Sequence, residues 1–79
     1  MNTMKLAIRH LEAGDWEAAH EIVQEDHSVA GSWAHGIVHL LEGDRSNAGY
    51  WYRKAGRPIP AESAIEAEIA ALKAHMNDA

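Results

Sequence analysis

The sequence contains no cysteine and no phenylalanine, and it has only two prolines among 79 residues. Without cysteine the chain has no disulfide framework, no thiolate nucleophile and no cysteine-bound zinc. It also lacks an apolar run of about 18 residues, so we expect no membrane-spanning helix. Its first residues lack the apolar stretch of a secretory signal, and together these absences predict a cytoplasmic protein.

Acidic residues outnumber basic residues by 12 to 7, which gives a formal net charge of −5 with the six histidines neutral. An acidic balance disfavours the phosphate neutralisation on which non-specific nucleic-acid binding depends. The segment Tyr50–Lys54 does mix aromatic and basic side chains, as single-strand binding grooves do. Helical spacing divides it between a core face with Trp51 and Tyr52 and a solvated face, so we do not expect a nucleic-acid partner.

The chain repeats itself at an offset of 29 residues, which places Ile8 on Ile37 and the pair Gly14-Asp15 on Gly43-Asp44. Glycine tolerates the left-handed conformation that ends a helix, and an aspartate directly after it can cap the next helix. Each half is therefore predicted to form a helix, a tight turn and an antiparallel helix. The repeats span about 3–28 and 29–60 of a single domain, 1–79, with helices expected at about 3–13, 16–25, 29–42, 45–55 and 61–76. No alternating strand pattern occurs, so the predicted fold is all-α.

The second repeat resembles a tetratricopeptide repeat in its small residues, its aromatic and its proline, which are Gly36, Gly43-Asp44, Ala48, Tyr52, Ala55 and Pro60. The first repeat keeps Ala7, Gly14-Asp15 and Ala19. The resemblance implies a solenoid fragment of two helical hairpins, although the offset is shorter than the family's repeat of about 34 residues. The chain also resembles a group of small uncharacterised bacterial proteins, a likeness that implies no activity.

A two-hairpin solenoid exposes its ends, so we expect the helix at 61–76 to act as a cap. Its apolar stripe is predicted to lie on the second hairpin, with its glutamates, Glu68 among them, turned to water. The small core that results favours self-association into a homo-oligomer. Gly36 is costly in the middle of a helix, and we expect it at a close crossing with the helix at 45–55 or at 61–76.

The resemblance implies a non-enzymatic protein that binds a protein partner, or itself, in the groove lined by the helices at 3–13 and 29–42. Large apolar side chains dominate interfaces, and the expected contacts are Trp33, Ile37, Trp16 and Tyr50. No serine, cysteine or paired-carboxylate constellation indicates catalysis, so we assign no catalytic residue and no cofactor.

An alternative function follows from His35 and His39, which lie four residues apart and share one helix face with Glu42. Two such imidazoles can bind a divalent metal or a small molecule, with hydrolytic chemistry as a further option, if His20 or Glu21 supplies a third ligand. The helical wheel places them on a polar edge opposite Trp33 and Ile37. This predicts instead structural histidines that are solvated or bonded to neighbouring backbone, with no tight zinc binding. Convergence of His20, His35 and His39 in space would distinguish the two hypotheses.

Overall fold

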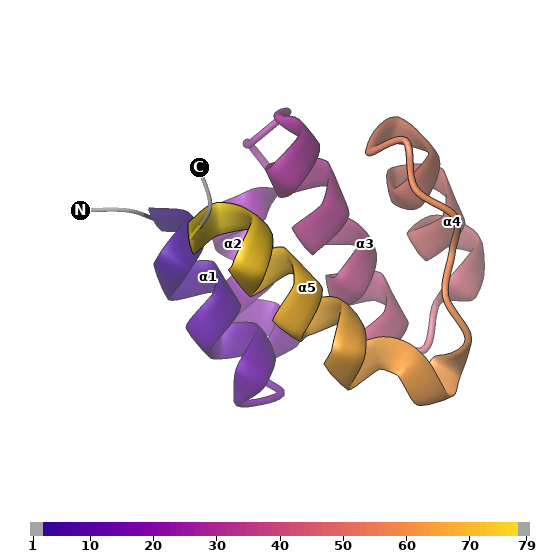
Figure 1. The fold of residues 1–79 in the computed structure, drawn as a ribbon, viewed down its shortest axis with the longest axis horizontal. Helices are drawn as coiled ribbons and strands as arrows, with labels where there is room; N and C mark the ends of the chain where they lie inside the picture. Colours follow the sequence, from indigo (N-terminus) through magenta and orange to yellow (C-terminus); the bar gives the residue numbers. More distant parts are fainter. Residues whose placement is uncertain (1–2, 78–79) are drawn as a thin grey trace.

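The computed structural model describes residues 3–77, and this part of the chain is helical without any strand. The elements are α1 (Thr3–Glu12), α2 (Trp16–Val23), α3 (Val29–Glu42), α4 (Arg45–Lys54), a short 3₁₀ helix η1 (Glu62–Ala64) and α5 (Ile65–Asn77) (Figure 1). The predicted all-α fold class is therefore confirmed. None of the helices between residues 3 and 77 combines the length and the apolar character that a membrane-spanning helix needs.

Two equivalent turns join α1 to α2 and α3 to α4. Gly14 and Gly43 adopt positive φ angles of 77° and 89°, which only glycine enters without a steric penalty. Asp15 and Asp44 follow, and each side chain accepts a hydrogen bond from the backbone N–H three residues later, at 3.3 and 3.2 Å. The glycine stop and the aspartate cap thus work as the sequence predicts, and they fold each half into an antiparallel hairpin.

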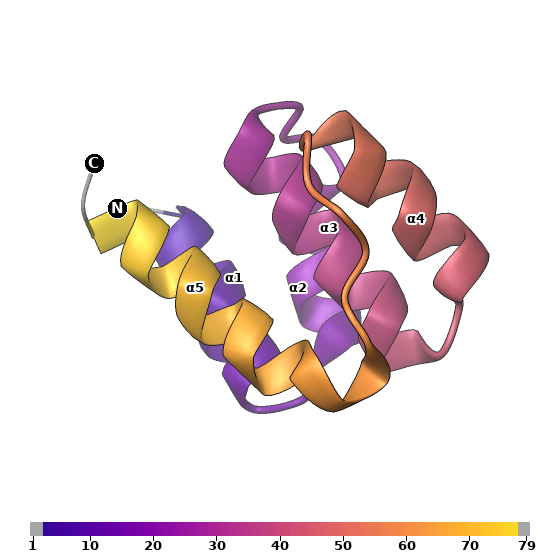
Figure 2. The same cartoon turned by 45° about the vertical axis from the view of Figure 1, so that its right-hand side comes forward.

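Helix α3 is the centre of the molecule. It contacts α1, α2, α4 and α5, and every residue from Gly31 to Leu40 is buried (Figures 1 and 2). Its sequence explains this position, because no aspartate, glutamate, lysine or arginine occurs between Val29 and Leu41. A helix without charged residues on any face can be enclosed by neighbours without burying an unpaired charge.

The crossing of α3 and α4 depends on Gly36. A Cβ atom at this position would lie 2.6 and 2.8 Å from two ring carbons of Tyr52, which is fully buried on α4. The missing side chain therefore lets the tyrosine ring pack closely against α3. This confirms the predicted close helix crossing at Gly36 and shows that α4 is the helix that crosses α3 there.

Helix α5 lies across α1 and α3, one helix from each hairpin, whereas the sequence predicted contact with the second hairpin (Figure 2). Ile69 and Leu72 supply its buried side chains. Glu68 does not turn to water as expected: its Oε1 accepts hydrogen bonds from Tyr52 Oη at 2.9 Å and from Trp33 Nε1 at 3.1 Å. Both donors are buried and need an acceptor, so Glu68 fixes α5 to α3 and α4.

Candidate functional site

Three histidines from two hairpins converge between α2 and α3. His20 comes from α2, and His35 and His39 come from consecutive turns of α3. Each offers a ring nitrogen, and the three nitrogens lie within 4.8 Å of one another. The ring centroids are separated by 4.8 Å for His20 and His35, 4.9 Å for His35 and His39, and 5.7 Å for His20 and His39. We call these three residues the histidine cluster.

The cluster is largely enclosed by protein. The exposed fraction is 5% for His35 and 7% for His39, while His20 is half-buried at the edge. Of the two structural alternatives, the solvated edge is therefore wrong for the two histidines of α3. It assumed that α3 has one buried face, but α2 and α4 cover the face that carries the histidines. On the α4 side Trp51 stacks on His35, with ring centroids 3.8 Å apart and an interplanar angle of 9°.

The environment keeps His35 neutral. Burial, and after it the neighbouring His39 and His20, lowers the pKa of His35 to about 4, from an ordinary value of 6.5. At neutral pH this imidazole therefore offers a free lone pair. Its Nδ1 atom is buried and has no hydrogen-bond partner. Buried polar atoms without partners are rare in folded proteins, so an unpartnered ring nitrogen on a histidine beside two other imidazoles is a candidate ligand atom.

His39 is oriented by a carboxylate. Its Nδ1 lies 2.7 Å from Oε1 of Glu42, one turn further along α3. A carboxylate at this distance holds the proton on Nδ1, which leaves the lone pair on Nε2. Histidines that bind metal ions commonly have such a partner on their second nitrogen, because it sets the tautomer and raises the basicity of the ligand.

A second group, His39 with Glu42 and Asp44, also places its ligand atoms within 4.8 Å of one another. Its two carboxylates are exposed, and each already has a role: Glu42 pairs with His39, and Asp44 caps α4. We therefore regard Glu42 as a support for the histidine cluster rather than as part of a separate site.

The cluster is slightly wider than a closed tetrahedral site. Zinc–nitrogen bonds of about 2.0–2.1 Å place ligand nitrogens about 3.4 Å apart. His20 is half-buried while His35 and His39 are buried, so rotation of the His20 side chain is the movement that would bring the nitrogens closer. Among residues 3–77 no fourth histidine, aspartate or glutamate joins the three. The cluster therefore offers three protein ligands and leaves one coordination position open.

The residues expected to contact a partner lie elsewhere. Trp33 and Ile37 are in the core, with exposed fractions of 3% and 0%, so they are not accessible to a partner in this structure. Trp16 is half-buried, and Tyr50 is the most accessible of the four, at 48%. Glu21, considered as a third metal ligand, is exposed and does not belong to the cluster.

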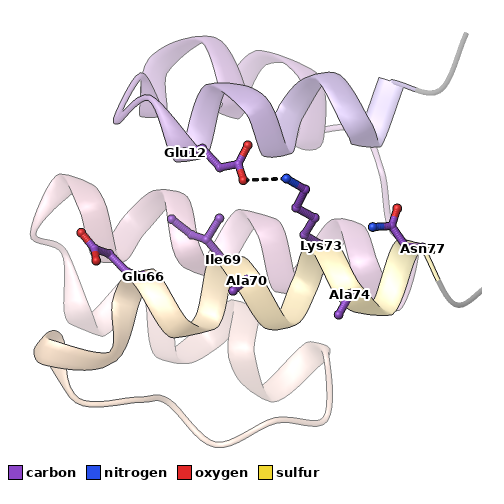
Figure 3. Close-up of a pocket in the computed structure, with 7 residues that line it drawn as sticks. All are labelled: Glu12, Glu66, Ile69, Ala70, Lys73, Ala74 and Asn77. Carbon is purple, nitrogen blue, oxygen red and sulfur yellow. Dashed lines mark hydrogen bonds and ion pairs between the residues drawn. The ribbon is translucent and has the colours of Figure 1, made fainter.

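A shallow groove lies between α1 and α5, on a part of the surface formed by neither His20 nor the α3 histidines (Figure 3). An ion pair spans it, with Lys73 Nζ 3.2 Å from Glu12 Oε2. The polar side chains that line it are all exposed. Exposed ion pairs contribute little and are screened by salt, so this groove has no chemistry that selects a ligand.

No protein-family model, no curated protein and no solved structure matches this chain. The tetratricopeptide resemblance therefore remains an expectation, and function has to be inferred from the geometry of the site. Sequence reasoning found the three histidines but missed Trp51 as the ring that stacks on His35. The uncharged stretch from Val29 to Leu41 was the available signal, since it marks α3 as a helix buried on every side.

Proposed function

We propose that this protein binds a divalent transition metal ion, with zinc as the first candidate, through His20, His35 and His39. The observation that carries this proposal is the convergence of three ring nitrogens from two hairpins to within 4.8 Å. Imidazole is a good ligand for zinc, copper and nickel, and three histidines with an open position form a well-known type of zinc site.

The alternative explanation, a purely structural cluster, has an energetic weakness. Each buried polar atom without a partner costs about 1–3 kcal/mol, and His35 Nδ1 is such an atom. His35 and His39 stack on each other, and stacked imidazole rings do not donate hydrogen bonds to each other's nitrogens, because their N–H groups lie in the ring planes. A metal ion bound by the cluster would use one ring nitrogen from each of the three histidines. The carboxylate of Glu42 supports the same interpretation, because it prepares His39 to bind through Nε2.

Binding of a protein partner is the less well supported of the two candidate functions. It depended on anchors in the groove of α1 and α3, but α5 contacts both helices, and Trp33 and Ile37 are buried. Tyr50 and Trp16 remain as candidate contacts, and self-association remains a prediction. The fold alone assigns no reaction, and we propose a binding function rather than an enzymatic one.

Calorimetric titration of zinc into the metal-free protein tests the proposal. We expect saturable binding of one ion per chain. Loss of a residue that only hydrogen-bonds to a metal ligand weakens metal binding by roughly 10- to 100-fold. His20→Ala should weaken zinc binding by more than this, because it removes a ligand itself. His20 is the best choice for substitution, since it is half-buried and its removal leaves the core intact.

The chain provides a matched control in His10, which occupies in the first repeat the place of His39 in the second. His10 lies outside the cluster, 3.9 Å from a carboxylate oxygen of Asp15. His10→Ala should therefore bind zinc as the unmodified protein does. At free zinc 100 times the Kd, the free energy of unfolding should rise by about 2.7 kcal/mol. Absence of saturable heat with the unmodified protein, or equal affinity in His20→Ala, would refute the proposal.

A further inference from the structure

We infer that the metal ion held by the histidine cluster carries one exchangeable external ligand, and that this ligand is a small monovalent anion such as a carboxylate. The inference rests on the proposed metal binding and specifies what the same site recognises. Its first support is the ligand count: three imidazoles from residues 3–77 approach one point, and no fourth acidic or histidine side chain accompanies them. Zinc sites with three protein ligands take a solvent molecule or another small ligand in the fourth position.

The charge of the site selects the type of ligand. A divalent ion brings two positive charges, and histidine ligands bind in their neutral form. The carboxylate of Glu42, bonded to His39, and that of Asp44, which also lies within 4.8 Å of His39, contribute two negative charges. Lys54 adds one positive charge beside Trp51, so the site with its ion carries a net charge of +1. An uncompensated charge is unfavourable among buried side chains, so a monovalent anion is the ligand that completes the balance.

The cation in this balance, Lys54, lies close to the histidine cluster. Lys54 Nζ lies 5.0 Å from the centre of the Trp51 ring, and that ring stacks directly on His35. The positive charge of Lys54 also lowers the pKa of His35, although less than burial and the other two histidines do. It therefore belongs to the electrostatic environment that an incoming ligand meets.

Access limits the size of the ligand. His35 and His39 are almost completely covered, and Trp51 forms a wall on the α4 side. His20 is half-buried and is the most exposed member of the cluster. The burial of the other two rings favours an anion of a few heavy atoms over a peptide or a nucleotide.

The test uses the full chain loaded with cobalt(II), whose visible spectrum reports its coordination, and titrates it with acetate or azide. We expect a saturable spectral change with either anion and none with perchlorate, which coordinates poorly, at equal ionic strength. If cobalt(II) binds but acetate and azide change nothing beyond the effect of perchlorate, the inference is overturned while the proposed metal binding stands. If cobalt(II) and zinc both fail to bind, the proposed function itself fails, and the inference with it.

Two substitutions with opposite expected effects test the charge argument. Glu42→Gln raises the net charge of the site, so cobalt(II) should bind about 10- to 100-fold more weakly while acetate binds the loaded protein severalfold more tightly. Lys54→Gln removes the nearby cation and should weaken acetate binding without loss of cobalt(II). Acetate affinities that do not change, or that change in the reverse directions, would contradict an electrostatic choice of ligand.

Discussion

Substitution of Gly36 by alanine tests the helix crossing on which the position of the site depends. In an exposed helix this change would stabilise the protein by about 1 kcal/mol, because glycine is the poorer helix former. Here the new methyl group would lie 2.6 Å from a carbon of the Tyr52 ring, well inside van der Waals contact. The ring cannot turn aside easily, since it is fully buried and its hydroxyl donates to Glu68 at 2.9 Å.

The expected magnitude follows from these opposing effects. Overpacking a buried site costs about 1–3 kcal/mol, and a rigid aromatic neighbour places this position at the upper end of the range. Moving the ring also weakens a charge-assisted hydrogen bond worth about 1.5–3 kcal/mol when intact. After the gain in helix propensity is subtracted, we expect Gly36→Ala to destabilise the protein by about 2 kcal/mol. For a domain of this size that lowers the Tm by about 8–16 °C.

Gly49 offers a control within the partner helix. A Cβ atom there would meet its nearest neighbours at 3.6 and 4.0 Å, which are ordinary contacts. Gly49→Ala should therefore stabilise the protein by up to about 1 kcal/mol. Thermal and urea unfolding followed by circular dichroism measure both variants. A Tm that rises in Gly36→Ala as it does in Gly49→Ala would refute the close packing of α3 on α4.

Two further predictions concern buried polar groups. In the metal-free protein, neutral His35 should make its full contribution to the free energy of unfolding above pH 6.5. This contribution should be lost as the pH falls toward 4, because His35 takes up a proton at a higher pH in the unfolded chain than in the folded protein. The loss should reach about 3 kcal/mol, and urea titrations across this range should show a smaller loss in His35→Leu. Glu68→Ala leaves the Trp33 and Tyr52 donors without their acceptor and should cost about 2–3 kcal/mol in chemical denaturation. Replacement of the exposed Glu66 by alanine should change stability by less than about 0.5 kcal/mol, and equal losses in both variants would contradict a specific role for Glu68.

The helices and turns could be predicted from the sequence because the interactions that define them are local. Gly14 and Gly43 end their helices through a conformation that depends on one residue. Asp15 and Asp44 cap the following helices through bonds to a backbone N–H only three residues away. The close approach at Gly36 was also predictable, since a glycine within a helix needs a packing reason. None of these inferences required knowledge of how distant segments meet.

The site was determined by tertiary packing. His20 and His35 are separated by a turn and belong to different hairpins, so their approach depends on how α2 lies against α3. The helical wheel assigned His35 and His39 to a polar edge because it treats a helix as having one buried side. Four helices surround α3, and the burial that results makes His35 neutral and leaves its Nδ1 without a partner. Periodicity along one helix specifies which residues share a face, but what covers that face depends on contacts with helices distant in the sequence.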